Sequence, residues 1–294
     1  MERRDFLRTA ALSTLAAVSL SPLADAQNGA LMQRLRARQP QLLGRRRGKK
    51  VRLSVQLYSV RDAAAKDLAG ALAKIAKMGY DGVEFAGYYG KDPKDIRKML
   101  DDVGLKCSGT HTGIGELRGD RFERTAELHK TLGTKYMIVP GGIDNYLHDV
   151  EKSKEIAAEF NEIAKKARTF GLSVGYHAHG GDAKLIDGTP AWERLFDATN
   201  REVVMQMDIG NYKDGGGDPY KMIEKFRGRS KTVHLKESGQ GHPIIGSGTV
   251  DWKRVFTLCE TIGGTEWYVV EDEVTADNFD RIEKCIIALR EMGK

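Results

Sequence analysis

Eight short apolar runs, each followed by an amphipathic segment, dominate the chain from Val51 to its end. The runs are rich in Val, Leu, Ile and Tyr, which is typical of strands buried on both faces of a parallel sheet. They span residues 51–59, 81–85, 105–112, 135–142, 172–179, 203–210, 231–236 and 266–273. The regular alternation of apolar runs and amphipathic segments predicts a fold built from repeated strand–helix units.

The segments between the runs carry the signals of helices. Residues 67–79, 93–104, 120–133 and 150–171 each combine an apolar stripe with a charged face and end in glycine, as helix C-termini often do. Eight units in the 244 residues from Val51 match a (β/α)8 barrel, for which about 250 residues is typical. An open doubly wound sheet is the alternative, but no G-x-G-x-x-G follows the first run. We predict an α/β fold, a single (β/α)8 TIM barrel that forms a catalytic domain over residues 51–294.

The start of the chain has the pattern of an export signal. A pair of arginines, Arg3 and Arg4, precedes a short apolar run that ends in a small-residue cleavage pattern after Ala26. This order is typical of a twin-arginine signal, and the apolar run is too short to span a membrane. We therefore predict a signal peptide over residues 1–26, a periplasmic mature protein, and no stable membrane insertion after the signal is removed.

The net charge of +6 comes from one segment. Residues 27–50 carry eight basic residues and no acidic ones, residues 1–26 are balanced, and the predicted barrel therefore carries a net charge of −2. A basic run of this kind is most often a solvated linker. We predict a linker arm over residues 27–50 and no nucleic-acid binding, because the folded body has no excess of basic residues.

Ionisable side chains gather at the C-terminal ends of the predicted strands, where TIM barrels carry their chemistry. Seven of the eight runs end in such groups. If these groups converge on one rim, like charges there would repel one another unless a counter-ion lies between them. Period-two alternation puts His177 and His179 on one face of a strand, and it does the same for His234 and Lys236. The candidate catalytic residues at this rim are Glu84, His111, His177, Lys236 and Glu271.

Nine motifs, in order along the chain, resemble those of a known group of enzymes. They are GYDGVEFAG, GTHTG, GYHAH, IDGTP, MDIGN, GGGDP, VHLKE, GSGTVDW and WYVVEDE. Together they are similar to the xylose isomerase-like barrel superfamily, in particular to its sugar phosphate isomerase/epimerase branch with ketose 3-epimerases and inosose dehydratases. The resemblance covers nearly all of residues 51–294. Because members of this family often pair, it also implies a homodimer.

The resemblance implies one divalent cation with four ligands. By position, the ligands of the family fall on Asp182, Asp208, His234 and Glu271. Three carboxylates and one imidazole form an oxygen-rich set that suits Mn²⁺ first, with Mg²⁺, Co²⁺ or Zn²⁺ as alternatives. Asp182 stands where the family usually has the longer Glu, so His179 is the substitute ligand. The same change weakens a mechanism that uses two carboxylate bases.

These residues suit the removal of a proton next to a carbonyl group. A bound cation stabilises the enediolate that forms, and Glu271 is the candidate base. We predict an isomerase or epimerase of an unphosphorylated keto-sugar. A lyase or hydratase that eliminates a β-substituent from a 3-keto-glycoside is the first alternative, and a sugar-binding barrel without catalysis is the second. An apurinic endonuclease-like barrel shares the fold but needs more metal-binding histidines and a basic face.

Overall fold

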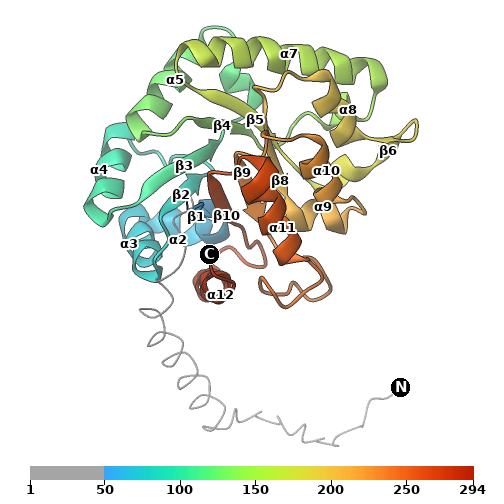
Figure 1. Ribbon diagram of the computed structural model, residues 1–294. Helices are drawn as coiled ribbons and strands as arrows, with labels where there is room; N and C mark the ends of the chain where they lie inside the picture. Colours follow the sequence, from blue (N-terminus) through green and yellow to red (C-terminus); the bar gives the residue numbers. More distant parts are fainter. Residues whose placement is uncertain (1–49) are drawn as a thin grey trace, which may run out of the picture. The chain divides into compact units, whose positions relative to one another are not determined.

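The computed structural model describes residues 50–294, which form a closed barrel of eight parallel strands surrounded by helices (Figure 1). The barrel strands are β1 (Arg52–Gln56), β2 (Gly82–Phe85), β3 (Lys106–His111), β4 (Tyr136–Val139), β5 (Ser173–His177), β8 (Val204–Asp208), β9 (Thr232–Leu235) and β10 (Trp267–Val270). Each strand pairs with the next in this order, and β10 pairs with β1 to close the barrel. The predicted single TIM barrel is confirmed. The predicted signal peptide, and the predicted arm apart from Lys50, lie outside the described residues.

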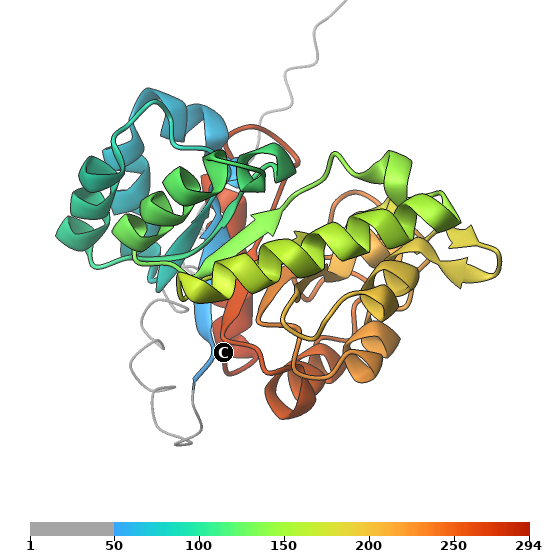
Figure 2. The same ribbon diagram turned by 90° about the horizontal axis from the view of Figure 1, so that it is seen from above.

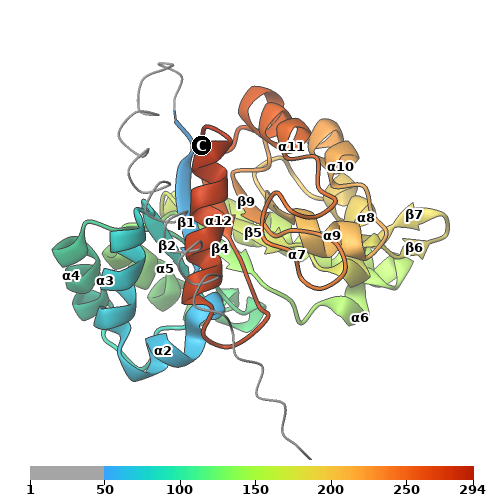
Figure 3. The same cartoon turned by 90° about the horizontal axis from the view of Figure 1, so that it is seen from below.

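Helices connect the strands on the outside of the barrel (Figure 2). They are α2 (Arg61–Lys66), α3 (Leu68–Met78), α4 (Pro93–Val103), α5 (Arg121–Leu132), α6 (Asp144–Leu147), α7 (Val150–Thr169), α8 (Ala191–Ala198), α9 (Ile209–Asp214), α10 (Pro219–Lys225), α11 (Trp252–Leu258) and α12 (Phe279–Glu291). Figure 3 shows α12 running lengthwise beside β1. Within residues 50–294, no helix has both the length and the apolar character needed to cross a membrane.

Shorter elements lie mainly at the ends of the barrel strands. The 3₁₀ turns η2 (Leu57–Val60), η3 (Ile114–Leu117) and η4 (Gly180–Ala183) come after β1, β3 and β5, respectively. A hairpin of β6 (Leu185–Ile186) and β7 (Thr189–Pro190) precedes α8, and a π-helical turn, η5 (Cys259–Gly263), extends α11. Two of the 3₁₀ turns, η2 and η4, directly border the rim at which the sequence predicts the chemistry.

The helix ends follow the predicted glycine signals. Helix α4 begins after Asp92, whose carboxylate accepts a hydrogen bond from the Lys94 N–H, and has Pro93 in its first turn. It ends at Gly104, where φ is 75°. This left-handed conformation is strained for side chains with a Cβ, so glycine is the natural residue there.

Alternate residues of the strands point into the barrel and form layers. The layer near the start of the strands is a small apolar cluster of Tyr136, Ile138, Val204, Trp267 and Val269. Further along these strands the inward positions become polar, since Gln206 and Asp208 lie two and four residues after Val204, and Glu271 lies two residues after Val269. An apolar base therefore supports a polar layer at the C-terminal end of the barrel.

A buried histidine joins helix α5 to strand β3 outside this polar layer. The Nδ1–H of His129 donates to the carbonyl oxygen of Thr125 at 2.7 Å, and its Nε2 accepts from the hydroxyl of Thr110 at 2.5 Å. Both contacts suit a neutral ring. Burial lowers the pKa of His129 to about 4, although the bond to Thr125 opposes this shift.

We expect His129 to make the fold sensitive to acid. The unfolded chain gains a proton on this residue below pH ~6.5, whereas the folded chain gains it only near pH 4. Its contribution to the free energy of unfolding is therefore complete above pH 6.5 and falls by about 1.5 kcal/mol between pH 6.5 and 5. Urea unfolding of the parent and of His129→Gln at both pH values measures this difference. An equal loss in both proteins would contradict it, and His148→Gln, at an exposed position, is the control.

Candidate active site

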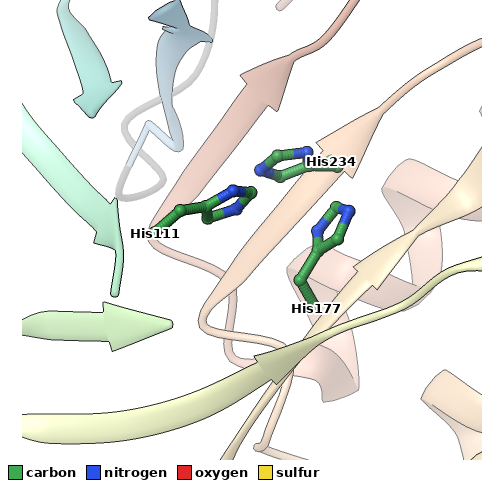
Figure 4. A group of neighbouring side chains, drawn as sticks. All are labelled: His111, His177 and His234. Atoms are coloured by element: carbon green, nitrogen blue, oxygen red, sulfur yellow. The ribbon is translucent and has the colours of Figure 1, made fainter. Parts of the chain in front are cut away.

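Three histidines from three strands point toward one another at the C-terminal end of the barrel (Figure 4). His111 ends β3, His177 ends β5, and His234 lies in β9. The ring centroids of His177 and His234 are 4.5 Å apart, and those of His111 and His177 are 4.9 Å apart. The strand ends therefore converge as the sequence predicts.

Two carboxylates join two of these histidines in a buried cluster. Ligand atoms of His177, Asp208, His234 and Glu271 all lie within 4.8 Å of one another. The Nδ1 atom of His234 is 3.3 Å from Glu271 Oε2 and 4.0 Å from Asp208 Oδ2. The Nε2 atom of His177 is 4.0 Å from the same oxygen of Asp208. We refer to these four residues as the four-residue cluster.

Asp208 shows that this cluster fits a cation. Its Oδ1 accepts the backbone N–H of Asn211 at 2.8 Å, which caps the start of α9. Its Oδ2 is buried and has no hydrogen-bond partner among the described residues. Burial raises the pKa of Asp208 to about 7, although the positive charge of Lys236 opposes this shift. Because a buried carboxylate oxygen without a donor is costly, and carboxylates and imidazoles are common ligands, a divalent cation suits the cluster.

Glu84 fixes the orientation of His234 from β2. Its Oε2 accepts from His234 Nε2 at 2.6 Å and from Gln56 Nε2 at 2.8 Å, and its Oε1 accepts from Gln206 Nε2 at 2.8 Å. Because Nε2–H donates to Glu84, Nδ1 is the atom that faces the cluster, and a cation bound there would displace the Nδ1 proton. Burial works against both charges, but the attraction between the two groups is stronger. The pKa of Glu84 lies well below its usual range, and that of His234 rises to about 10.

Gln206 orients the other two histidines. Its Oε1 accepts from His111 Nε2 and from His177 Nδ1, both at 3.0 Å. With Nδ1 as the donor, the Nε2 atom of His177 keeps a free lone pair on the side of the ring that faces Asp208. Burial, reinforced by the neighbouring His234, holds the pKa of His177 well below its usual value. A neutral His177 ring could therefore hold a cation through Nε2.

The predicted ligands Asp182 and His179 lie outside the cluster, and His177 takes the place at the end of β5. Asp182 lies in η4, where its Oδ2 accepts the backbone N–H of His179 at 2.7 Å and its Oδ1 accepts the Tyr176 hydroxyl at 3.3 Å. Its carboxylate thus closes the turn after the strand, and burial raises its pKa to about 7. The His179 ring packs edge-on against His177. The resemblance implied both ligands by position, but the chain turns into η4 after β5, and this turn holds the Asp182 carboxylate away from the cluster.

A pocket of about 380 Å³ opens onto the cluster. It is lined by Tyr58, Ala86, His111, Pro140, His177, His179, Asn211, Glu271 and Glu273. Lys236 forms an ion pair with Glu273, and its Nζ lies 3.9 Å from Glu271 Oε2. Burial opposes the charge of Lys236, but the nearby carboxylates of Asp208 and Glu271 raise its pKa above its ordinary value. The pocket has the size of a small-molecule site, and its lining includes a carboxylate, Glu271, that lies close to the ammonium group of Lys236 outside the lining.

The structure brings together all five predicted catalytic residues and three of the four predicted ligands. The five are Glu84, His111, His177, Lys236 and Glu271, and the three ligands are Asp208, His234 and Glu271. Gln56 and Gln206, which orient this network, were missing from the prediction. A signal for Gln206 was present, because it lies two residues before Asp208 and therefore on the same face of β8.

Comparisons with known proteins agree with this architecture. A sequence model of the xylose isomerase-like TIM barrel family matches residues 72–292. The chain is 26% identical to the inosose dehydratase of Erwinia tasmaniensis, with 69% of this chain and 81% of the relative covered. It is 23% identical to that of Lacticaseibacillus casei, with the same coverage. A solved structure of a sugar phosphate isomerase/epimerase from Parabacteroides distasonis has a TM-score of 0.72 at 22% identity, covering 84% of this chain and 98% of that one.

Proposed function

This chain belongs to the xylose isomerase-like TIM barrel family, and we propose that it is a metal-dependent enzyme that removes a proton next to the carbonyl group of an unphosphorylated keto-sugar. The observation that carries the proposal is the four-residue cluster beside the pocket, with the unpartnered buried oxygen of Asp208 described above. The relatives named inosose dehydratase support a sugar-like substrate. Manganese is the first candidate for the cation.

The chain supplies distinct groups for binding and for proton transfer. A cation held by the four-residue cluster would polarise a bound carbonyl and stabilise the negative charge that develops on its oxygen. Glu271 is the proposed base, because its carboxylate belongs to the four-residue cluster and also lines the pocket in which a substrate would bind. Lys236 places a positive charge 3.9 Å from this carboxylate. His111, oriented by Gln206, is available to hydrogen-bond the substrate.

The lining of the pocket favours an unphosphorylated sugar. Among the described residues that line it, none is Lys or Arg, and two are glutamates, Glu271 and Glu273. A phosphate group is normally bound by Arg, Lys or a helix N-terminus, and carboxylates repel it. The ammonium group of Lys236 is already paired with Glu273.

Three outcomes can follow removal of the proton. Its return to the opposite face gives epimerisation, and its return to the neighbouring carbon gives aldose–ketose isomerisation. In a 3-keto-glycoside, loss of the C2 proton followed by departure of the C1 substituent gives elimination, which makes the protein a lyase. The position of Asp182 favours this second candidate, because a carboxylate used to close η4 is poorly placed as a second base. A sugar-binding barrel without catalysis is the remaining alternative.

The proposal predicts exchange of a substrate proton with solvent. The purified protein is loaded with manganese in deuterated water and given, in separate reactions, a free ketose and a 3-keto-glycoside. Deuterium incorporation without release of the aglycone supports the isomerase or epimerase, and aglycone release supports the lyase. If neither occurs although the metal is bound, the enzyme proposal fails and the sugar-binding barrel remains.

We also propose that the protein is exported to the periplasm and is cleaved after Ala26, and that residues 27–50 form a linker arm. The support is the sequence pattern of residues 1–50 alone. N-terminal sequencing of the protein recovered from the periplasm tests cleavage, and light scattering of the same sample tests the proposed homodimer.

A further inference from the structure

One aromatic side chain at the pocket is exposed although its neighbours in the chain are buried. In the turn η2, Leu57, Ser59 and Val60 are buried, whereas Tyr58 is 42% exposed and lines the pocket. Among the four large apolar side chains that are exposed in residues 50–294, Tyr58 is the one that lines this pocket.

The Tyr58 ring is held in a fixed orientation from one side. The Arg61 guanidinium lies over the ring, 4.3 Å from its centroid, and donates to the carbonyl oxygens of Tyr58 at 3.0 Å and Thr275 at 3.3 Å. The backbone N–H of Tyr58 donates to Gln56 Oε1 at 3.2 Å, and the other end of that amide bonds Glu84. One face of the ring is therefore covered by Arg61, and the backbone of Tyr58 is hydrogen-bonded through Gln56 to the buried Glu84. A ring that is ordered in advance loses little entropy when a ligand packs on it.

The depth of the pocket determines what could reach this ring. The proposed base and ligands lie at the buried end, where Asp208 and His234 are fully buried and Glu271 is only 6% exposed. Tyr58 lies at the exposed end of the same pocket. A sugar ring that binds at the buried end would direct a group attached to it toward the exposed end, where Tyr58 lies.

We propose that Tyr58 is a stacking platform for the aglycone ring of a keto-glycoside, which makes it a specificity-determining residue. The inference rests on the proposed function, because it takes the sugar ring at the base to be the one that reacts. Aromatic side chains offer a large, rigid apolar face to a flat partner, and the positive guanidinium behind the Tyr58 ring strengthens its fixed position. Asn211 and Glu273 add polar groups at the same opening.

Binding of two unreactive glycosides tests the platform without any turnover. Calorimetry measures the dissociation constants of 4-nitrophenyl β-glucoside and methyl β-glucoside, which differ only in the aglycone. We expect the parent to prefer the aryl glycoside and Tyr58→Ala to lose about 10-fold of that preference, while Tyr58→Phe retains it. Leu185→Ala is the matched control, because Leu185 is another exposed apolar side chain, 62% exposed, on the β6–β7 hairpin and outside the pocket lining.

Two results would overturn the platform. One is a parent protein without preference for the aryl glycoside, and the other is a Tyr58→Ala variant with the preference of the parent. Since neither measurement involves proton removal, these results would leave the proposed reaction standing. Conversely, absence of solvent exchange on any keto-sugar would count against the reaction and not against the stacking surface.

Discussion

Replacing Glu271 by Gln is expected to lower turnover roughly 1,000-fold or more, because an amide has the shape of the carboxylate but cannot accept the proton. Glu271 directly follows β10, lies in the four-residue cluster and lines the pocket. The measurement is the initial rate of deuterium exchange on the keto-sugar that the parent turns over. The manganese content of the variant is determined in parallel, so that loss of the base can be told apart from loss of the cation.

The matched control for Glu271 is a glutamate at the other end of the same strand. Glu266 directly precedes β10 and pairs with Lys135, and it is absent from the pocket lining. Glu266→Gln should retain the exchange rate of the parent within a factor of about two, as is usual for a change remote from a site. If Glu271→Gln also exchanges at the parent rate, another group removes the proton.

Replacing Asp208 by Asn is expected to weaken manganese binding by more than about 100-fold. Loss of a residue that only hydrogen-bonds a metal ligand already weakens binding by up to about 100-fold, and Asp208 is a proposed ligand itself. The amide oxygen can still accept the Asn211 N–H at the start of α9, so the cap survives. What disappears is the negative charge on the oxygen that lacks a partner among the described residues. Calorimetric titration of metal-free protein with Mn²⁺ measures the affinity directly.

Thermal unfolding provides a second readout for Asp208. At 100 times the dissociation constant, a cation stabilises the folded state by about 2.7 kcal/mol, or ~5–10 °C for a chain of this size. The parent should show this rise with Mn²⁺ and Asp208→Asn should not. Asp182→Asn is the control, because Asp182 is a buried carboxylate whose two oxygens are both hydrogen-bonded. If Mn²⁺ no longer raised the unfolding temperature of Asp182→Asn but still raised that of Asp208→Asn, the cation would bind at η4 and not in the four-residue cluster.

The barrel was predictable because its signals repeat along the chain. Each strand is buried on both faces and therefore reads as a short apolar run, and helices such as α4 end at glycines that adopt a left-handed conformation. The short turns η2 and η4 were not predicted. They are single turns that depend on contacts such as that of Asp182 with Tyr176, and these contacts form only when the barrel is folded.

The candidate site was predictable as far as the strands extend. Alternation places His234, Asp208 and Glu271 on inward faces because each follows an inward apolar or polar residue two positions earlier. It says nothing of Asp182, which the resemblance implied and which lies beyond the end of β5, where the backbone no longer alternates. It also gave no role to the uncharged amides, so that Gln206, which orients two histidines, was missed.

The central claim is that one divalent cation lies among Asp208, His234 and Glu271. Anomalous diffraction from crystals grown with manganese tests it most directly. We expect a single strong anomalous peak within bonding distance of Asp208 Oδ2, His234 Nδ1 and a carboxylate oxygen of Glu271. A crystal saturated with manganese that shows no peak between these side chains, or shows it beside Asp182 instead, would contradict this cation site.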